Sequence, residues 1–172
     1  MQSNAPNHLR MAAAALAVAC AATVIVSTPP ALAAEFKAGA ITIEQPWSRA
    51  TPGGAKVASG YLTIENSGDS GDRLVSVTAD IAGRTEIHQM SMIGGVMQMR
   101  QLTDGLPIPA KGSVALEPSS YHLMFVDLSK PLQEGETFSG KLTFEKAGAV
   151  DVTFEVSGIG TAAPDEGAGH HH

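Results

Sequence analysis

The stretch EIHQMSMIGGVMQMR at residues 86–100, followed by SYHLMFVDL at residues 120–128, decides how this chain folds. Gly94 and Gly95 stand at the centre of the first segment, and both can adopt positive φ without a Cβ clash. Such a pair favours a two-residue turn between antiparallel strands. We therefore expect a β-hairpin in which facing residues have numbers that sum to 189, as 94 and 95 do.

The predicted register gathers methionine and histidine on one face of the hairpin. Directly opposed residues project to the same face, and alternation along a strand keeps residues 88, 90 and 92 together. In the segment 120–128 the same alternation places His122 and Met124 on a shared face. The expected opposed pairs in the hairpin are Met92 with Met97, Met90 with Met99, and His88 with Gln101.

Outward from this stretch, the chain reads as short strands separated by Gly, Pro, Asn and Asp. We expect a loop over residues 46–54 and core positions for Trp47 and Tyr61. Seven to nine short strands without helical periodicity predict a single-domain, all-β antiparallel sandwich. The expected strands lie around residues 41–43, 57–66, 74–77, 85–88, 113–116, 123–128, 138–144 and 152–156.

Both ends of the chain differ in composition from this middle part. Residues 1–34 read as a secretory signal peptide cleaved after Ala33 or Ala34, because Arg10 precedes an apolar run too short to span a bilayer. Cys20 lacks the leucine usual three places before a lipidated cysteine, so we expect it to leave with the leader. The predicted domain is 35–158, and the small, polar residues 159–172 predict a disordered tail.

Composition excludes several classes of function. The formal net charge is -6, and loss of Arg10 with the leader makes it -7, which argues against nucleic-acid binding. No apolar run after the leader is long enough to span a bilayer. The sequence holds no Gly-x-Ser-x-Gly elbow, P-loop or His-Glu-x-x-His motif, so we do not expect an enzyme.

The residue types in the organising stretch favour a soft metal. All five Met residues beyond residue 34, and both His residues between residues 35 and 169, lie within residues 86–128. Thioether and imidazole together suit Cu(I), whereas zinc prefers thiolate, imidazole and carboxylate, and calcium prefers oxygen. A blue-copper electron-transfer site needs a Cys thiolate, which the chain lacks after residue 34. Copper that is bound without redox cycling indicates transport.

Simpler interpretations of the same residues stay open. A single Met in a strand usually fills a gap in a core, and a His in a strand usually hydrogen-bonds to backbone. For Met92 and Met97 we weigh core packing, exposed auxiliary sulfur and chance equally. For Glu86 and Asp127 we expect exposed acids at strand ends, with orientation of a ligating imidazole as the alternative.

The sequence also resembles a known family at these positions. His88, ten residues, Met99, a spacer and HLM at residues 122–124 resemble the periplasmic copper chaperones called PCuAC. The resemblance extends upstream to WSRATP at residues 47–52 and GYLTIEN at residues 60–66, and it covers roughly residues 40–157.

The resemblance implies a cupredoxin-like β-sandwich that binds Cu(I) near its surface through two His and two Met residues. We expect the protein to act as a monomer. The resemblance also implies delivery of copper to the dinuclear copper centre of cytochrome c oxidase, alone or with a Sco-type thiol protein. Matched position by position, the implied ligands are His88, Met99, His122 and Met124.

The chain departs from the family pattern in two places. The spacer between Met99 and His122 is one residue longer than usual, which we assign to a longer loop around residues 103–107. Gln89 follows His88, and the methionine is delayed to Met90, which makes Met90 a rival of Met99 as ligand.

The chain ends in three further imidazoles. Imidazoles without thioethers suit Cu(II) better than Cu(I). We therefore expect an auxiliary Cu(II) site at this end, in addition to auxiliary sulfur from Met90, Met92 and Met97. The three terminal residues are His170, His171 and His172.

Overall fold

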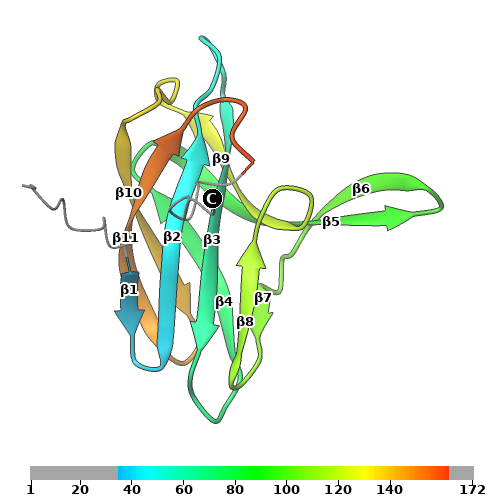
Figure 1. Ribbon diagram of the computed structural model, residues 1–172, viewed down its shortest axis with the longest axis vertical. Coiled ribbons are helices and arrows are strands. Elements are labelled where there is room, and N and C mark those ends of the chain that lie inside the picture. The colour runs from blue at the N-terminus through cyan, green and yellow to red at the C-terminus, as the bar shows by residue number, and fades with distance from the viewer. Residues whose placement is uncertain (1–34, 163–172) are drawn as a thin grey trace, which may run out of the picture. The chain divides into compact units, whose positions relative to one another are not determined.

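The computed structural model describes residues 35–162, which form eleven β-strands and no α-helix (Figure 1). All of these residues belong to the second of the two units into which the chain divides, Leu32–His172. The strands are β1 (Glu35–Ala38), β2 (Ile41–Arg49), β3 (Val57–Asn66), β4 (Asp72–Ala79), β5 (Ala82–Ile93), β6 (Val96–Gln101), β7 (Leu106–Ile108), β8 (Gly112–Leu116), β9 (Tyr121–Leu128), β10 (Thr137–Phe144) and β11 (Gly148–Ser157).

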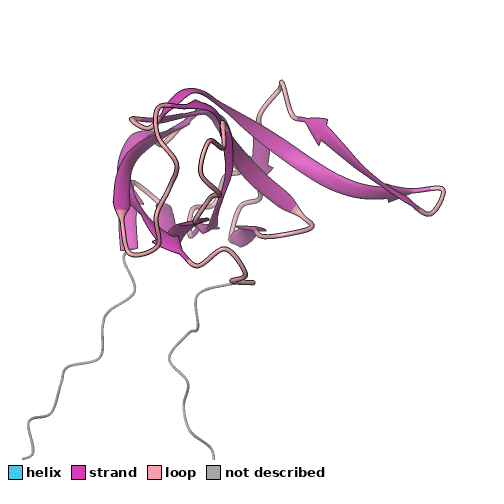
Figure 2. Cartoon of the chain, turned by 90° about the horizontal axis from the view of Figure 1, so that it is seen from above, coloured by secondary structure: helices cyan, strands magenta, loops and turns pink. Residues whose placement is uncertain are grey.

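The strands form one continuous hydrogen-bonded path in the order β6-β5-β9-β8-β3-β2-β11-β10-β4-β7, with β1 paired to β2. Seen end-on, the strands wrap around the core (Figure 2). Most neighbours are antiparallel, and the exceptions are the short parallel pairings of β11 with β2 and of β8 with β9. The all-β sandwich expected from the sequence is confirmed.

The N-terminal part of the expected loop at residues 46–54 is instead strand. β2 continues to Arg49, and its pairing with β3 shifts register between Glu44 and Trp47. Gln45 within this bulge has a φ of 48°. Pro46 is tolerated there because a bulge releases its position from the ladder of hydrogen bonds. The strand can therefore run past a proline that, in the sequence, signals a loop.

A strand also occupies part of the predicted longer loop around residues 103–107. A turn spans Thr103 and Asp104, and β7 then pairs with β4. Leu106 and Ile108 of β7 are 1% exposed, because alternation in this short strand points both toward the core. The segment expected as a longer loop is therefore partly a turn and partly an edge strand.

Three phenylalanine rings from three strands organise the core. Phe125 of β9 lies edge-on to Phe138 of β10 and Phe154 of β11, with centroids 5.2 and 5.4 Å away. Phe138 and Phe154 stack at 5.0 Å. Gly60 of β3 leaves room for this group, because a Cβ there would lie 2.5 Å from the Phe125 ring.

The period-two patterns predicted in the last two strands are confirmed by burial. All of the apolar residues that defined them are buried: Phe138, Leu142, Phe144, Val152, Phe154 and Val156. Trp47 and Tyr61 are also buried, as expected, with ring centroids 4.5 Å apart. The guanidinium carbon of Arg49 lies 5.9 and 5.5 Å from these two rings, and its Nε donates to the Thr161 carbonyl.

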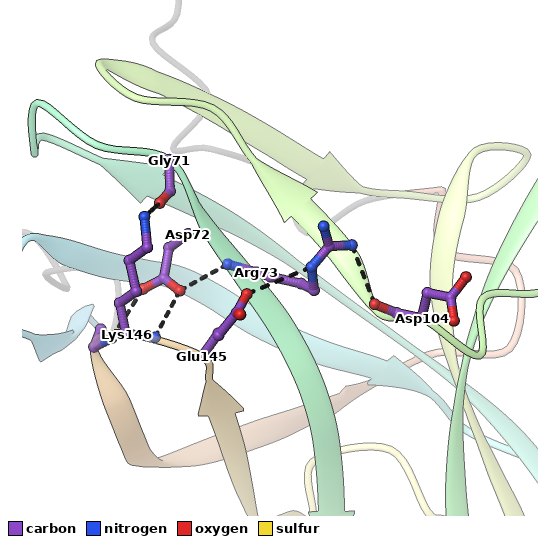
Figure 3. A network of polar contacts seen from close by, with 7 residues as sticks. Gly71, Asp72, Arg73, Asp104, Glu145 and Lys146 are labelled. Atoms are coloured by element: carbon purple, nitrogen blue, oxygen red, sulfur yellow. Dashed lines mark hydrogen bonds and ion pairs between the residues drawn. The ribbon is translucent and has the colours of Figure 1, made fainter.

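A polar network fixes the start of β4 against the turn between β10 and β11 (Figure 3). The Asp72 carboxylate accepts hydrogen bonds from the backbone N–H groups of Arg73, Lys146 and Ala147 at 2.7, 2.9 and 2.9 Å. The Arg73 side chain adds an ion pair with Glu145 and a hydrogen bond to the Asp104 carbonyl. The Asp72 carboxylate thus joins the start of β4 to the turn between β10 and β11, and the Arg73 side chain adds the turn at Asp104.

The hairpin of β5 and β6 extends beyond the rest of the sheet (Figure 1). β9 pairs with β5 as far as Gln89, after which the Met90 N–H donates to the Ser120 carbonyl. From there to the turn, β5 pairs with β6 alone. Residues 90–99 are called the hairpin arm below.

Candidate metal centre

The hairpin turn has the geometry expected from its two glycines. Gly94 and Gly95 have φ of 59° and 80°, so both occupy the region that favours glycine. The resulting register pairs Met92 with Met97, Met90 with Met99 and His88 with Gln101. The register predicted from the sequence is confirmed at every one of these pairs.

β9 completes the face by bringing the second histidine beside the first. His88 of β5 is directly opposite His122 of β9, and their ring centroids are 5.6 Å apart. Met124 is opposite Glu86 in the same register. Since opposed and alternate residues share a face, both imidazoles lie on the face that carries the methionines.

The His88 ring is held by one short hydrogen bond. Its Nε2 lies 2.7 Å from Oε2 of Glu86, and the other carboxylate oxygen accepts from Arg84 Nε at 3.0 Å. The hydrogen bonds from Arg84 and from His88 lower the pKa of Glu86, so its carboxylate is an acceptor only. Nε2 of a neutral His88 therefore carries the proton. Its Nδ1 carries the lone pair, is buried and has no hydrogen-bond partner among residues 35–162.

His122 has the opposite tautomer. Its Nδ1 lies 3.4 Å from the Ser120 carbonyl oxygen, which can only accept, so the lone pair lies on Nε2. Burial lowers the pKa of His122, the bond to Ser120 opposes this change, and the nearby His88 lowers the pKa further. The neutral imidazole, which is the form that binds metals, is thus favoured near neutral pH.

The five methionines differ in how far they are exposed. Met90 and Met124 are partly buried, whereas Met99, Met97 and Met92 are 50%, 44% and 64% exposed. Core packing is therefore wrong as an explanation for the three exposed residues. By register, Met90 is next to His88 along β5 and diagonal to His122, while Met99 is diagonal to His88 only.

Glu86 differs from the exposed acid expected at a strand end. Its side chain is 20% exposed and contacts the His88 ring directly. Asp127 fits the expectation better, since its side chain is 65% exposed and pairs with Arg84 at 2.8 Å. Alternation already places Glu86 on the His88 face, but the hydrogen bond depends on a rotamer that no sequence pattern specifies.

These donors fit a soft metal better than a hard one. Within residues 35–162, no group of three or more His, Cys, Asp or Glu side chains is arranged to hold a metal ion. On this face thioether side chains lie beside the two imidazoles, and thioether with imidazole is a combination suited to Cu(I). The unpartnered Nδ1 of His88 is consistent with a ligand nitrogen.

Sequence comparison places this arrangement in a family. A family model described as "Putative lipoprotein LpqE-like" matches residues 41–156, which span all of the strands that carry the candidate ligands. The chain belongs to this LpqE-like family. Solved structures of PCuAC domains, described next, confirm the PCuAC resemblance noted in the sequence.

Solved structures of PCuAC domains share the fold of this LpqE-like chain. It is 29% identical to the apo PmoF2 PCuAC domain, with a TM-score of 0.64, over 76% of this chain and 99% of that one. It is 31% identical to the copper-bound PCuAC domain from PmoF2, with a TM-score of 0.62, over 73% of this chain and 98% of that one. It is 26% identical to CuI-DR1885 from Deinococcus radiodurans, with a TM-score of 0.55, over 66% of this chain and 75% of that one.

Two curated proteins are also similar to the LpqE-like chain. The "Putative lipoprotein Lxx21020" of Leifsonia xyli subsp. xyli is 26% identical over 70% of this chain and 71% of its own length. An uncharacterized protein of Rickettsia prowazekii, RP573, is 31% identical over 61% of this chain and 59% of its own length. No helix within residues 35–162 is both long and apolar enough to cross a membrane. Cys20 and the three terminal His residues lie outside the described residues.

Proposed function

We propose that the protein is a periplasmic copper chaperone that binds Cu(I) through His88, Met99, His122 and Met124. The observation that carries the proposal is the pairing of His88 with His122, whose rings lie 5.6 Å apart on the methionine-bearing face. Similarity to a copper-bound PCuAC domain and to CuI-DR1885 supports both copper and its reduced state.

The position of the site suits delivery rather than storage. All four proposed ligands are neutral, and Met99 is 50% exposed at the base of the hairpin arm. A thiolate from a partner can therefore reach the copper and replace the thioethers one at a time, because thiolate is the stronger soft ligand. Replacement of a thioether by a thiolate does not change the oxidation state of the copper.

The proposed recipients follow from the family resemblance. Copper would pass to the copper-site subunit of cytochrome c oxidase, directly or with a Sco-type protein, and the protein would act as a monomer outside the cytoplasm. The lipoprotein descriptions of the matching family and of the Leifsonia relative support export. The terminal residues 170–172 are proposed to take up Cu(II) separately.

A transfer assay tests the proposal. The Cu(I)-loaded protein is mixed with the isolated copper domain of a cytochrome c oxidase subunit, and metal in each protein is measured after separation. At one equivalent of Cu(I) we expect stoichiometric transfer from the wild type, and much weaker Cu(I) binding by the His88→Asn/His122→Asn variant, which lacks both imidazoles of the site. Loading without transfer would instead indicate copper sequestration for tolerance.

A second candidate function is supported by the apolar surface of the hairpin arm. In a secreted β-sandwich that binds other proteins, exposed residues such as Met92 and Ile93 would form an adaptable contact surface. Such a surface does not need imidazoles. Retained partner binding in the His88→Asn/His122→Asn variant, with no copper bound by the wild type, would favour this function.

A further inference from the structure

The hairpin arm exposes apolar side chains that the core does not use. Eight large apolar side chains are exposed among residues 35–162, and five of them lie on the arm. An exposed apolar hairpin with a free edge strand promotes aggregation unless it is covered, and such a surface usually marks a binding site. The five are Met92, Ile93, Val96, Met97 and Met99.

The hydrogen-bonding pattern of the hairpin brings the methionines together in pairs. The Leu102 N–H donates to the Ile87 carbonyl, which makes residues 87 and 102 a hydrogen-bonded pair. Since such pairs alternate along an antiparallel ladder, Met90 with Met99 and Met92 with Met97 are non-hydrogen-bonded pairs. Side chains approach most closely at these positions, with Cα atoms about 4.5 Å apart.

The two pairs form successive rungs on one face of the arm. Four thioethers thus extend from the turn toward His88 and His122, and no carboxylate or imidazole lies between the rungs. Each Met side chain has three rotatable bonds beyond its backbone, so two or three sulfur atoms can converge on one ion. Uncharged sulfur in this number binds Cu(I) or Ag(I) and discriminates against Zn²⁺, Ca²⁺ and Mg²⁺.

We propose that Met92 and Met97 form a second soft-metal site on the hairpin arm. A third thioether completes it, either from Met90 or from Met99. The other of these two residues binds the metal that His88 and His122 hold. The second site binds monovalent Cu(I) or Ag(I) through thioether sulfur alone. It is the weaker of the two sites, because it is exposed and has no imidazole. Copper arriving at the tip of the arm can then move inward by exchange of thioether for imidazole, with no change in charge.

Methionine methyl NMR with Ag(I) as the probe tests this second site. The protein without residues 1–34, whose Cys20 thiol would otherwise take up Ag(I) first, is labelled with ¹³C at its methionine methyl groups and titrated with Ag(I). Each signal is assigned by a Met→Leu variant. In the wild type we expect the Met124 signal to shift with the first equivalent and the Met92 and Met97 signals with the second. In Met92→Leu/Met97→Leu the methionine signals should respond to one equivalent only.

The Leu variant is a matched control because it keeps an apolar side chain at two exposed positions and so leaves the fold and any adhesive surface intact. The second site is refuted if the Met92 and Met97 signals do not shift, or if they shift together with Met124 in the first equivalent. Shifts at Met92 and Met97 that persist in His88→Asn/His122→Asn support the second site independently. If Met124 alone fails to respond, the proposed function fails while the second site stands.

Discussion

Glu86 and His88 are joined by the hydrogen bond that fixes which imidazole nitrogen has a free lone pair. Because the carboxylate accepts from Nε2, the lone pair of His88 remains on the buried Nδ1. Carboxylates that hydrogen-bond to a ligating histidine set its tautomer and raise its basicity. At the scale of single residues, Glu86 is therefore a positioning residue: it fixes the tautomer of His88 and is not one of the proposed ligands.

We expect Glu86→Gln to weaken Cu(I) binding by roughly 10- to 100-fold, the usual effect of removing such a partner. The glutamine amide can donate to Nε2 and so favour the wrong tautomer of His88. Competition against a chromophoric Cu(I) chelator measures the affinity, and the imidazole ¹⁵N shifts of the metal-free protein report the tautomer.

Asp127→Asn is the control for this substitution, because Asp127 also pairs with Arg84 but makes no contact with His88. Its affinity for Cu(I) should stay close to that of the wild type. Unchanged affinity and unchanged ¹⁵N shifts in Glu86→Gln would refute the positioning role.

At the scale of single elements, the register of the hairpin could be predicted because two adjacent glycines identify a two-residue turn. Alternation also predicted that His122 and Met124 share a face, but the register that sets His88 opposite His122 comes from the pairing of β9 with β5. The continuation of β2 past Pro46 could not be predicted in this way. Its bulge at Gln45 is stabilised by pairing with β3 and β11, and these long-range partners leave no local signal.

Asp72 shows how one side chain can hold several elements together. Burial raises its pKa, but hydrogen bonds from the backbone N–H groups of Lys146, Arg73 and Ala147 outweigh this effect and lower the pKa of the carboxyl group from its usual value. The folded state therefore binds this proton less readily than the unfolded state. The stabilisation is complete above the unfolded pKa and is lost as pH falls through the folded value.

We expect Asp72→Asn to lower the free energy of unfolding by about 1–3 kcal/mol near neutral pH, because its amide nitrogen cannot accept a hydrogen bond from Ala147. The difference from the wild type should shrink as pH falls below about 3.8. Urea denaturation near neutral pH and again below about pH 3.8 measures this difference in the free energy of unfolding. Asp151→Asn is the control, because the Asp151 side chain is 80% exposed and its ion pair with Lys141 should contribute little to stability at either pH. An equal loss in the two variants would contradict this account of Asp72.

At the scale of the whole molecule, close packing around the phenylalanine rings holds the layers together. We expect Gly60→Ala to destabilise the fold by about 1–3 kcal/mol, because the added methyl group overlaps the Phe125 ring. Thermal unfolding followed by circular dichroism measures the change. Gly53→Ala is the control, since a Cβ there meets no atom within 4 Å. A wild-type melting temperature in Gly60→Ala would show that the core can relax around the methyl group.

The most direct test of the central claim is X-ray absorption spectroscopy on the protein without residues 1–34, loaded with one equivalent of Cu(I) and compared with its Met99→Leu and Met90→Leu variants. The account predicts mixed nitrogen and sulfur scattering that loses one of its two sulfur atoms in Met99→Leu and keeps both in Met90→Leu. Loss of sulfur in Met90→Leu alone would keep the site but replace Met99 by Met90. Scattering from nitrogen alone, or no stoichiometric Cu(I), would contradict a His and Met copper site on this face.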